Sequence, residues 1–157
     1  MIIANACEHL LEALQGVVIV IFTVSGADGY PRSRPMVLQE VDHEGTLWFF
    51  VGRSSALALD IRQHPQVAIA TAEHQAMAYV AVVGVAHPCE DRLKASQLWK
   101  DEYLTWFPLG AADPDLLLLR VESQTVECWN GMTHHHFALP QRNPRCWFTA
   151  IDAWTDT

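Results

Sequence analysis

The stretch VVIVIFTV at residues 17–24 decides the fold class. Its residues are almost all apolar and mostly β-branched, which favours an extended strand over a helix. The turn-forming segment SGADG follows at residues 25–29, and a second extended stretch covers residues 33–40. Two such runs separated by a glycine-containing turn are typical of a β-hairpin. The sequence therefore predicts a fold that is built from antiparallel strands.

Five further segments have the same apolar, β-branched or aromatic character. They are residues 46–51, 66–71, 77–86, 116–121 and 125–129. Helical spacing of apolar residues predicts three helices, at residues 5–15, 55–64 and 90–103. Because an open sheet that is apolar on both faces needs a cover, the pattern predicts a mainly β fold with flanking helices, a small closed or split β-barrel.

Composition and length fit one compact domain followed by an extension. The chain has 157 residues, of which 50% are hydrophobic and 18% are charged, which excludes a disordered body. Strand and helix periodicity is lost from residue 131 onward, although large apolar side chains continue. We therefore expect a barrel domain at residues 1–130 and a C-terminal extension at residues 131–157 that packs on the barrel or on a partner subunit.

Charge and apolar run length exclude several classes of partner. Ten Lys and Arg residues against eighteen Asp and Glu residues give a net charge of −8, which disfavours nucleic acid and anionic lipid. The longest strongly apolar run has about eight residues, far below the ~20 that a membrane-spanning helix needs. The four cysteines form no CxxC pair. The sequence thus predicts a cytoplasmic protein with free thiols, without nucleic-acid or membrane partners.

A phosphate site is the first candidate for chemistry. Ser54 and Ser55 stand at the start of the predicted second helix, where hydroxyls and free backbone N–H groups bind anions. Arg34, on a neighbouring predicted strand, can add a bidentate guanidinium. The alternative interpretation is that Ser54 only caps the helix and that Arg34 is only a surface charge.

A metal site is the second candidate. His134, His135 and His136 lie near Cys128 in the sequence. Adjacent residues of a strand point to opposite faces, whereas a tetrahedral site needs convergent ligands. We therefore predict no metal site and a polar turn at this position.

Several short motifs together carry a family resemblance. The chain resembles the general stress protein 26 branch of the pyridoxamine 5'-phosphate oxidase-related, FMN-binding split-barrel proteins. The resemblance covers residues 17–130. The motifs that carry it are DGYP at 28–31, RPM at 34–36, GTLWFF at 45–50, SS at 54–55, HPQV at 64–67, GVA at 84–86, WFPLG at 106–110, DP at 113–114 and VECW at 126–129.

The resemblance implies a split-barrel homodimer with FMN in grooves at the subunit interface. It implies that Arg34 meets the phosphate and that Ser54 and Ser55 cradle it. Pro35 and Met36 would present backbone toward the isoalloxazine ring. The strand under the ring and ribityl chain would be Phe49, Phe50 and Val51. Separately from these positions, Trp129 on the last predicted strand is a candidate to lie near the partner's cofactor groove.

The chain departs from the family pattern at two positions. Ala56 stands where the family usually has a lysine after the paired serines, and Val51 stands where a threonine is common. One charge-assisted hydrogen bond contributes roughly 1.5–3 kcal/mol, so its loss weakens binding by about one to two powers of ten. Arg53 and Arg32 are the candidates to replace the missing lysine.

Three functions are compatible with these observations. The first is a flavin-dependent oxidoreductase that is related to pyridoxamine 5'-phosphate oxidase without being the true oxidase. The second is a flavin carrier or sensor without turnover. The third is a cofactor-free dimeric split barrel that has lost tight FMN binding.

Overall fold

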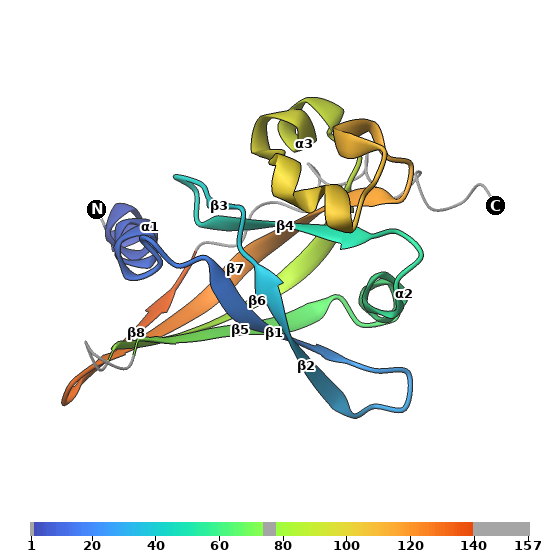
Figure 1. The fold of residues 1–157 in the computed structure, drawn as a ribbon. Helices are drawn as coiled ribbons and strands as arrows, with labels where there is room; N and C mark the ends of the chain where they lie inside the picture. Colours follow the sequence, from blue (N-terminus) through green and yellow to red (C-terminus); the bar gives the residue numbers. More distant parts are fainter. Residues whose placement is uncertain (1, 74–77, 140–157) are drawn as a thin grey trace.

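The computed structural model describes residues 2–73 and 78–139, and its centre is one curled antiparallel sheet in the form of a half-barrel (Figure 1). The sheet has eight strands in the order β2-β1-β5-β6-β7-β4-β3, with β8 also paired to β7. The strands are β1 (Ile19–Ser25), β2 (Pro31–Val37), β3 (Glu40–Val41), β4 (Thr46–Gly52), β5 (Gln66–Glu73), β6 (Ala78–Cys89), β7 (Leu116–Asn130) and β8 (Thr133–Ala138). The predicted mainly β, split-barrel fold class is confirmed.

The core lies on the inner face of the sheet. Phe22, Ile69, Val82 and Val126 are paired in one row across β1, β5, β6 and β7, and all four are buried. Phe49 of β4 closes on this row from the other side, with its ring edge-on to Phe22 at 5.3 Å. The apolar alternation of the strands therefore produces a continuous core between the two ends of the curled sheet.

A β-bulge between β6 and β7 lies next to Gly84. The register of the two strands shifts between Val83 and Gly84. A Cβ atom at Gly84 would lie 2.4 Å from the carbonyl oxygen of Glu122, which is inside van der Waals contact. Only glycine allows the two backbones to come this close, so the bulge bends the sheet at a position fixed by the sequence.

Three α-helices lie against the sheet: α1 (Ile2–Ala13), α2 (Ala56–Gln63) and α3 (Arg92–Leu98). In Figure 1, α1 lies near β3 and β8, α2 lies at the far end of β4, and α3 lies over β4. The hydroxyl oxygen of Ser55 caps α2 by accepting from the backbone N–H of Ala58 at 3.2 Å. None of the helices in the described part of the chain is long and apolar enough to cross a membrane.

The third predicted helix, residues 90–103, is shorter in the structure. It ends at Leu98, because Trp99 has extended backbone angles, and a 3₁₀ helix, η1 (Asp101–Thr105), follows. A second 3₁₀ helix, η2 (Gly110–Ala112), precedes β7. The break allows Trp99 and Tyr103 to pack edge-on at 5.7 Å, so tertiary aromatic packing overrides the helical spacing.

The C-terminal strands also differ from the prediction. The two strands predicted at residues 116–121 and 125–129 form one continuous strand, β7. Residues 133–138, where the sequence shows no periodicity, form β8 and pair with residues 125–130 of β7. Leu139 is buried in the core, and the remainder of the predicted extension, residues 140–157, lies outside the described residues.

The outer face of the sheet is apolar and exposed. Ile21, Ala70 and Ala81 are paired in one row across β1, β5 and β6. Val83 and Ile19 are exposed on the same face, at 46% and 51% of their full surface. Isolated exposed apolar residues are common, but several side by side on adjacent strands indicate an interaction surface.

Candidate functional site

A groove lies between β2 and β4, with η1 forming its third wall. Its volume is about 410 Å³, which is within the usual range for small-molecule sites. The lining combines strand residues with the aromatic side chains after α3: Pro35, Met36, Val37, Gln39, Phe50, Val51, Gly52, Tyr103, Trp106, Phe107 and Asp115. We call the part formed by Phe50, Tyr103, Trp106 and Phe107 the aromatic end, and the part formed by Gly52, Asp115 and the adjoining Ser54 the polar end.

Mutual packing holds the side chains of the aromatic end in place. The ring of Tyr103 is buried and lies edge-on to Phe50 at 5.8 Å. Its hydroxyl donates a hydrogen bond to Oε1 of Gln39 at 2.8 Å. Trp106 forms the rim and is 64% exposed. The aromatic end therefore offers a rigid, apolar wall with one exposed indole, a surface suited to a planar ring.

The predicted ring-binding residues lie in two environments. Pro35, Met36, Phe50 and Val51 line the groove. Phe49 is fully buried in the core and does not line it. Phe50 points to the opposite face of β4, where it packs on Tyr103. Val51 shares the face of Phe49 and is also buried, but it lies near the end of β4, where it borders the groove.

The polar end contains a carboxylate, Asp115, that is not among the residues predicted from the sequence. Oδ1 of Asp115 accepts hydrogen bonds from both the backbone N–H and the hydroxyl of Ser54, each at 2.9 Å. The carbonyl oxygen of Asp115 accepts from the backbone N–H of Arg53 at 2.7 Å. Asp115 lies directly before β7, whose residue Leu116 pairs with Gly52 of β4. The only sequence signal for this position was the DP motif at residues 113–114 just before it.

Ser55 and Arg34, the other predicted phosphate-binding residues, differ in whether the side chain already has a hydrogen-bond partner. Ser55 uses its hydroxyl to cap α2. Arg34 is half-buried on β2, opposite Phe22 of β1, and has no hydrogen-bond or ion-pair partner within residues 2–73 and 78–139. A half-buried guanidinium without a partner is able to bind an anion.

Arg53 and Arg32, the two candidates to replace the family lysine, are both engaged elsewhere. Arg53 forms an ion pair with Glu90 at 2.5 Å, and this hydrogen bond lowers the pKa of the Glu90 carboxyl. Both terminal nitrogens of Arg32 bind the carboxylate of Asp28, at 2.8 and 2.7 Å, which lowers the pKa of Asp28 to about 2. Neither arginine is available to an anion unless its ion pair opens.

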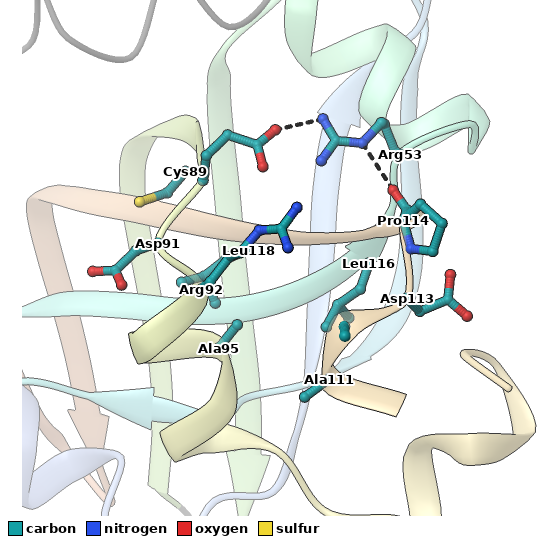
Figure 2. Close-up of a pocket in the computed structure, with 12 residues that line it drawn as sticks. Arg53, Cys89, Asp91, Arg92, Ala95, Ala111, Asp113, Pro114, Leu116 and Leu118 are labelled. Atoms are coloured by element: carbon teal, nitrogen blue, oxygen red, sulfur yellow. Dashed lines mark hydrogen bonds and ion pairs between the residues drawn. The ribbon is translucent and has the colours of Figure 1, made fainter. Parts of the chain in front are cut away.

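A second cavity of about 310 Å³ lies on the other side of Arg53, between α3 and η2 (Figure 2). The side chain of Arg53 is held there by Glu90 and by the carbonyl oxygen of Pro114, which accepts from Nε at 3.2 Å. Burial raises the pKa of the Cys89 thiol in its wall, so the reactive thiolate is disfavoured. This cavity has charges of both signs and no activated nucleophile among its described lining residues.

Trp129 lies at the opposite end of β7 from Asp115. Fourteen residues along a strand correspond to about 45 Å, so Trp129 is remote from the groove of its own chain. Its ring stacks on His134 at 4.9 Å, and Nε2 of His134 lies 3.0 Å from Oε2 of Glu127. His135 is paired with Cys128 on the adjacent position. In the described part of the chain, no three His, Cys, Asp or Glu side chains converge on a metal position.

Comparisons with known proteins find relatives of this fold. The family model described as pyridoxamine 5'-phosphate oxidase like matches residues 5–140. No curated protein sequence matches the chain. Solved structures similar to it include a Clostridium acetobutylicum protein related to general stress protein 26, with a TM-score of 0.73 and 20% identity over 86% of this chain and 95% of that one.

Two further solved structures differ in what they bind. The general stress FMN/FAD binding protein of Xanthomonas citri has a TM-score of 0.68 and 23% identity over 88% of this chain and 98% of its own. A haem binding protein of Mycobacterium smegmatis has a TM-score of 0.66 and 17% identity over 85% of this chain and 57% of its own. At these identities the likeness shows a common fold.

Proposed function

The chain belongs to the pyridoxamine 5'-phosphate oxidase-like family, and on that basis we propose that it binds a flavin, with FMN the expected form, in the groove between β2 and β4. The observation that carries the proposal is the aromatic end, where Phe50 and Tyr103 form a fixed apolar wall next to Met36. A planar tricyclic ring fits such a surface better than a flexible or charged ligand does.

Under this proposal the residues that line the groove and Arg34, which is not one of them, have separate tasks. Met36, Phe50 and Val51 would contact the ring and the start of the ribityl chain. Arg34, whose guanidinium has no polar partner in the described part of the chain, would meet the phosphate. The exposed indole of Trp106 would cover the ring and exclude water from it.

We further propose that the protein is a flavin-dependent oxidoreductase. A bound flavin supplies hydride and electron transfer, and the protein supplies binding, orientation and electrostatics. The hydrogen bond from Tyr103 to Gln39 fixes the wall of the groove and leaves its floor apolar. A flavin carrier or sensor without turnover would use the same residues, so the assay below separates the two functions.

Haem is the competing ligand, because one relative with this fold is a haem binding protein. Haem iron is most often held by histidine or by a cysteine thiolate. Neither residue type occurs among the described residues that line the groove, and the Tyr103 hydroxyl is already bonded to Gln39. Met36 is the one remaining lining residue of a type that ligates haem iron. The lining therefore favours a flavin over haem.

The test is the absorbance spectrum of the purified protein before and after addition of FMN, riboflavin or haem. We expect flavin bands after titration with either flavin, and no haem-specific Soret shift at equal concentration. Oxidation of NADH or NADPH by the flavin-loaded protein, with a small electron acceptor, would support the oxidoreductase; binding without turnover would support the carrier. A haem complex with no flavin complex would contradict the proposal.

We also propose a homodimer that forms through the outer apolar face of the sheet. Ile21 and Val83 are exposed there, and the paired positions on β1, β5 and β6 carry no charge. Apolar burial at ~25 cal/mol per Å² stabilises such an interface. In this dimer we expect Trp129 of each protomer to lie near the groove of the other.

Sedimentation at nanomolar concentration tests the dimer. We expect a dimer for the wild-type chain and a monomer for Val83→Glu, which places a charge in the centre of the face. Leu93→Glu is the matched control, because Leu93 is exposed on α3 away from the face. A wild-type monomer, or equal effects of both variants, would contradict the interface.

A further inference from the structure

The polar end of the groove already contains an anion of the protein itself. Oδ1 of Asp115 accepts from the N–H and the hydroxyl of Ser54, at 2.9 Å each. Two donors that converge on one oxygen in this way are also the arrangement that binds a phosphate oxygen. The carboxylate therefore occupies the donors that a ligand phosphate would need at Ser54.

Backbone contacts on both sides of Asp115 fix its position. Its N–H donates to Oδ1 of Asp113 at 2.9 Å, and its carbonyl oxygen accepts from the N–H of Arg53 at 2.7 Å. The residue after it, Leu116, begins the pairing of β7 with β4. Asp115 is thus held at the groove by the sheet and the preceding loop, and its carboxylate is not a mobile surface charge.

We propose that Asp115 determines the ligand specificity of the groove by competing with a phosphate for Ser54. The proposal rests on the proposed flavin site and concerns which flavin the site prefers. It follows that the wild-type protein binds riboflavin, whose ribityl chain is uncharged, about as tightly as FMN. The phosphate of FMN would gain Arg34, the cation that the proposed function assigns to it, but would meet the carboxylate of Asp115 at Ser54.

The charged groups around the polar end support the expectation that FMN and riboflavin bind about equally tightly. A phosphate and a carboxylate that share one set of donors repel each other. The nearby Arg53 is turned to Glu90, and Ala56 provides no cation. Of the described arginines considered for this end, Arg34 is the one without an ion-pair partner. The attraction of a phosphate to the Arg34 guanidinium is largely offset by its repulsion from the Asp115 carboxylate, so little net attraction remains.

The experiment measures the dissociation constants of FMN and riboflavin by quenching of flavin fluorescence. Asp115→Ala removes the carboxylate and releases both Ser54 donors, whereas Asp115→Asn keeps an acceptor and removes the charge. We expect FMN affinity to rise about tenfold or more in the alanine variant and less in the asparagine variant, with riboflavin affinity changed by less than about twofold. Asp101→Asn, an exposed carboxylate on η1, is the charge-matched control and should change neither.

A second probe, inorganic phosphate, keeps the proposal testable without any flavin. Phosphate at about 50 mM should raise the melting temperature of Asp115→Ala above that in chloride of equal ionic strength, and should not do so for the wild-type protein. If no variant binds either flavin, the proposed function fails, and the phosphate response alone decides the role of Asp115. Equal changes for FMN and riboflavin, weaker FMN binding in both variants, or no phosphate response in Asp115→Ala would overturn the proposal.

Discussion

At the aromatic end of the groove, Phe50 and Tyr103 pack edge-on as parts of the hydrophobic structure, whereas at the polar end Ser54 is hydrogen-bonded to Asp115. We expect the aromatic wall to stay the same when a ligand binds, because the same contacts stabilise the fold. The polar end has its donors satisfied within the chain, so a charged ligand must compete for them. The shape of the aromatic end therefore selects the flavin ring, whereas competition between Asp115 and the ligand for Ser54 determines the affinity for the phosphate.

Removal of the Arg34 guanidinium should produce the largest effect and should separate the two ends. We expect Arg34→Ala to weaken FMN about tenfold or more and to leave riboflavin nearly unchanged, since a charge-assisted hydrogen bond contributes roughly 1.5–3 kcal/mol. Titration with both flavins measures this difference. Arg32→Ala is the control, because Arg32 is engaged with Asp28. Equal losses for FMN and riboflavin would place Arg34 at the ring and not at the phosphate.

Substitution at the aromatic end should affect both flavins together. We expect Phe50→Leu to weaken FMN and riboflavin alike, by about fivefold, because it removes an aromatic contact that is worth about 1 kcal/mol. Phe49→Leu is the matched control on the same strand. It should lower the free energy of unfolding by about 1 kcal/mol and leave flavin affinity unchanged, because Phe49 lies in the core. The opposite pattern would show that Phe49, and not Phe50, faces the ligand.

An added lysine should strengthen the polar end alone. We expect Ala56→Lys to tighten FMN about threefold and to make its binding more sensitive to salt, without an effect on riboflavin. Leu59→Lys adds the same charge to an exposed position further along α2 and serves as the control. Titrations at low and high ionic strength measure the difference. Unchanged FMN affinity would mean that another cation already serves this position.

The smallest effect concerns the ion pair that holds Arg53 away from the groove. The hydrogen bond from Arg53 lowers the pKa of Glu90 below its ordinary value of 4.5. The ion pair therefore stabilises the native state above pH 4.5, and this contribution is lost as the pH falls through the lowered pKa of Glu90. We expect Glu90→Gln to cost less than about 1 kcal/mol at pH 7, because both side chains are partly exposed. Unfolding by urea over a series of pH values from 7 downward should show this difference at pH 7 and its loss as the pH falls through the lowered pKa of Glu90. A difference that did not change with pH would rule out the charge as its cause.

The aromatic end could be predicted from the sequence to a greater extent than the polar end. The aromatic and β-branched run at residues 46–51 indicated a strand, and the family resemblance placed Phe50 and Val51 at the groove. Phe49 does not line the groove because it is buried in the core, whereas Val51, on the same face near the strand end, does line it.

The arrangement of the polar end could not be predicted from the sequence. The hydrogen bonds between Ser54 and Asp115 join residues that are 61 positions apart, and they form only because β7 pairs with β4. The ion pair of Arg53 with Glu90 likewise depends on the fold. β8 was missed because its histidines are exposed and show no apolar alternation, so only pairing with β7 defines it as a strand.

A crystal structure of the protein with riboflavin tests directly whether the groove is the flavin site. We expect electron density for the isoalloxazine ring in the groove, in contact with Met36 and Phe50, with Asp115 still bonded to Ser54. Riboflavin bound in the cavity beside Arg53 and Glu90, or a groove without ligand density at saturating riboflavin, would show that the groove is not the flavin site.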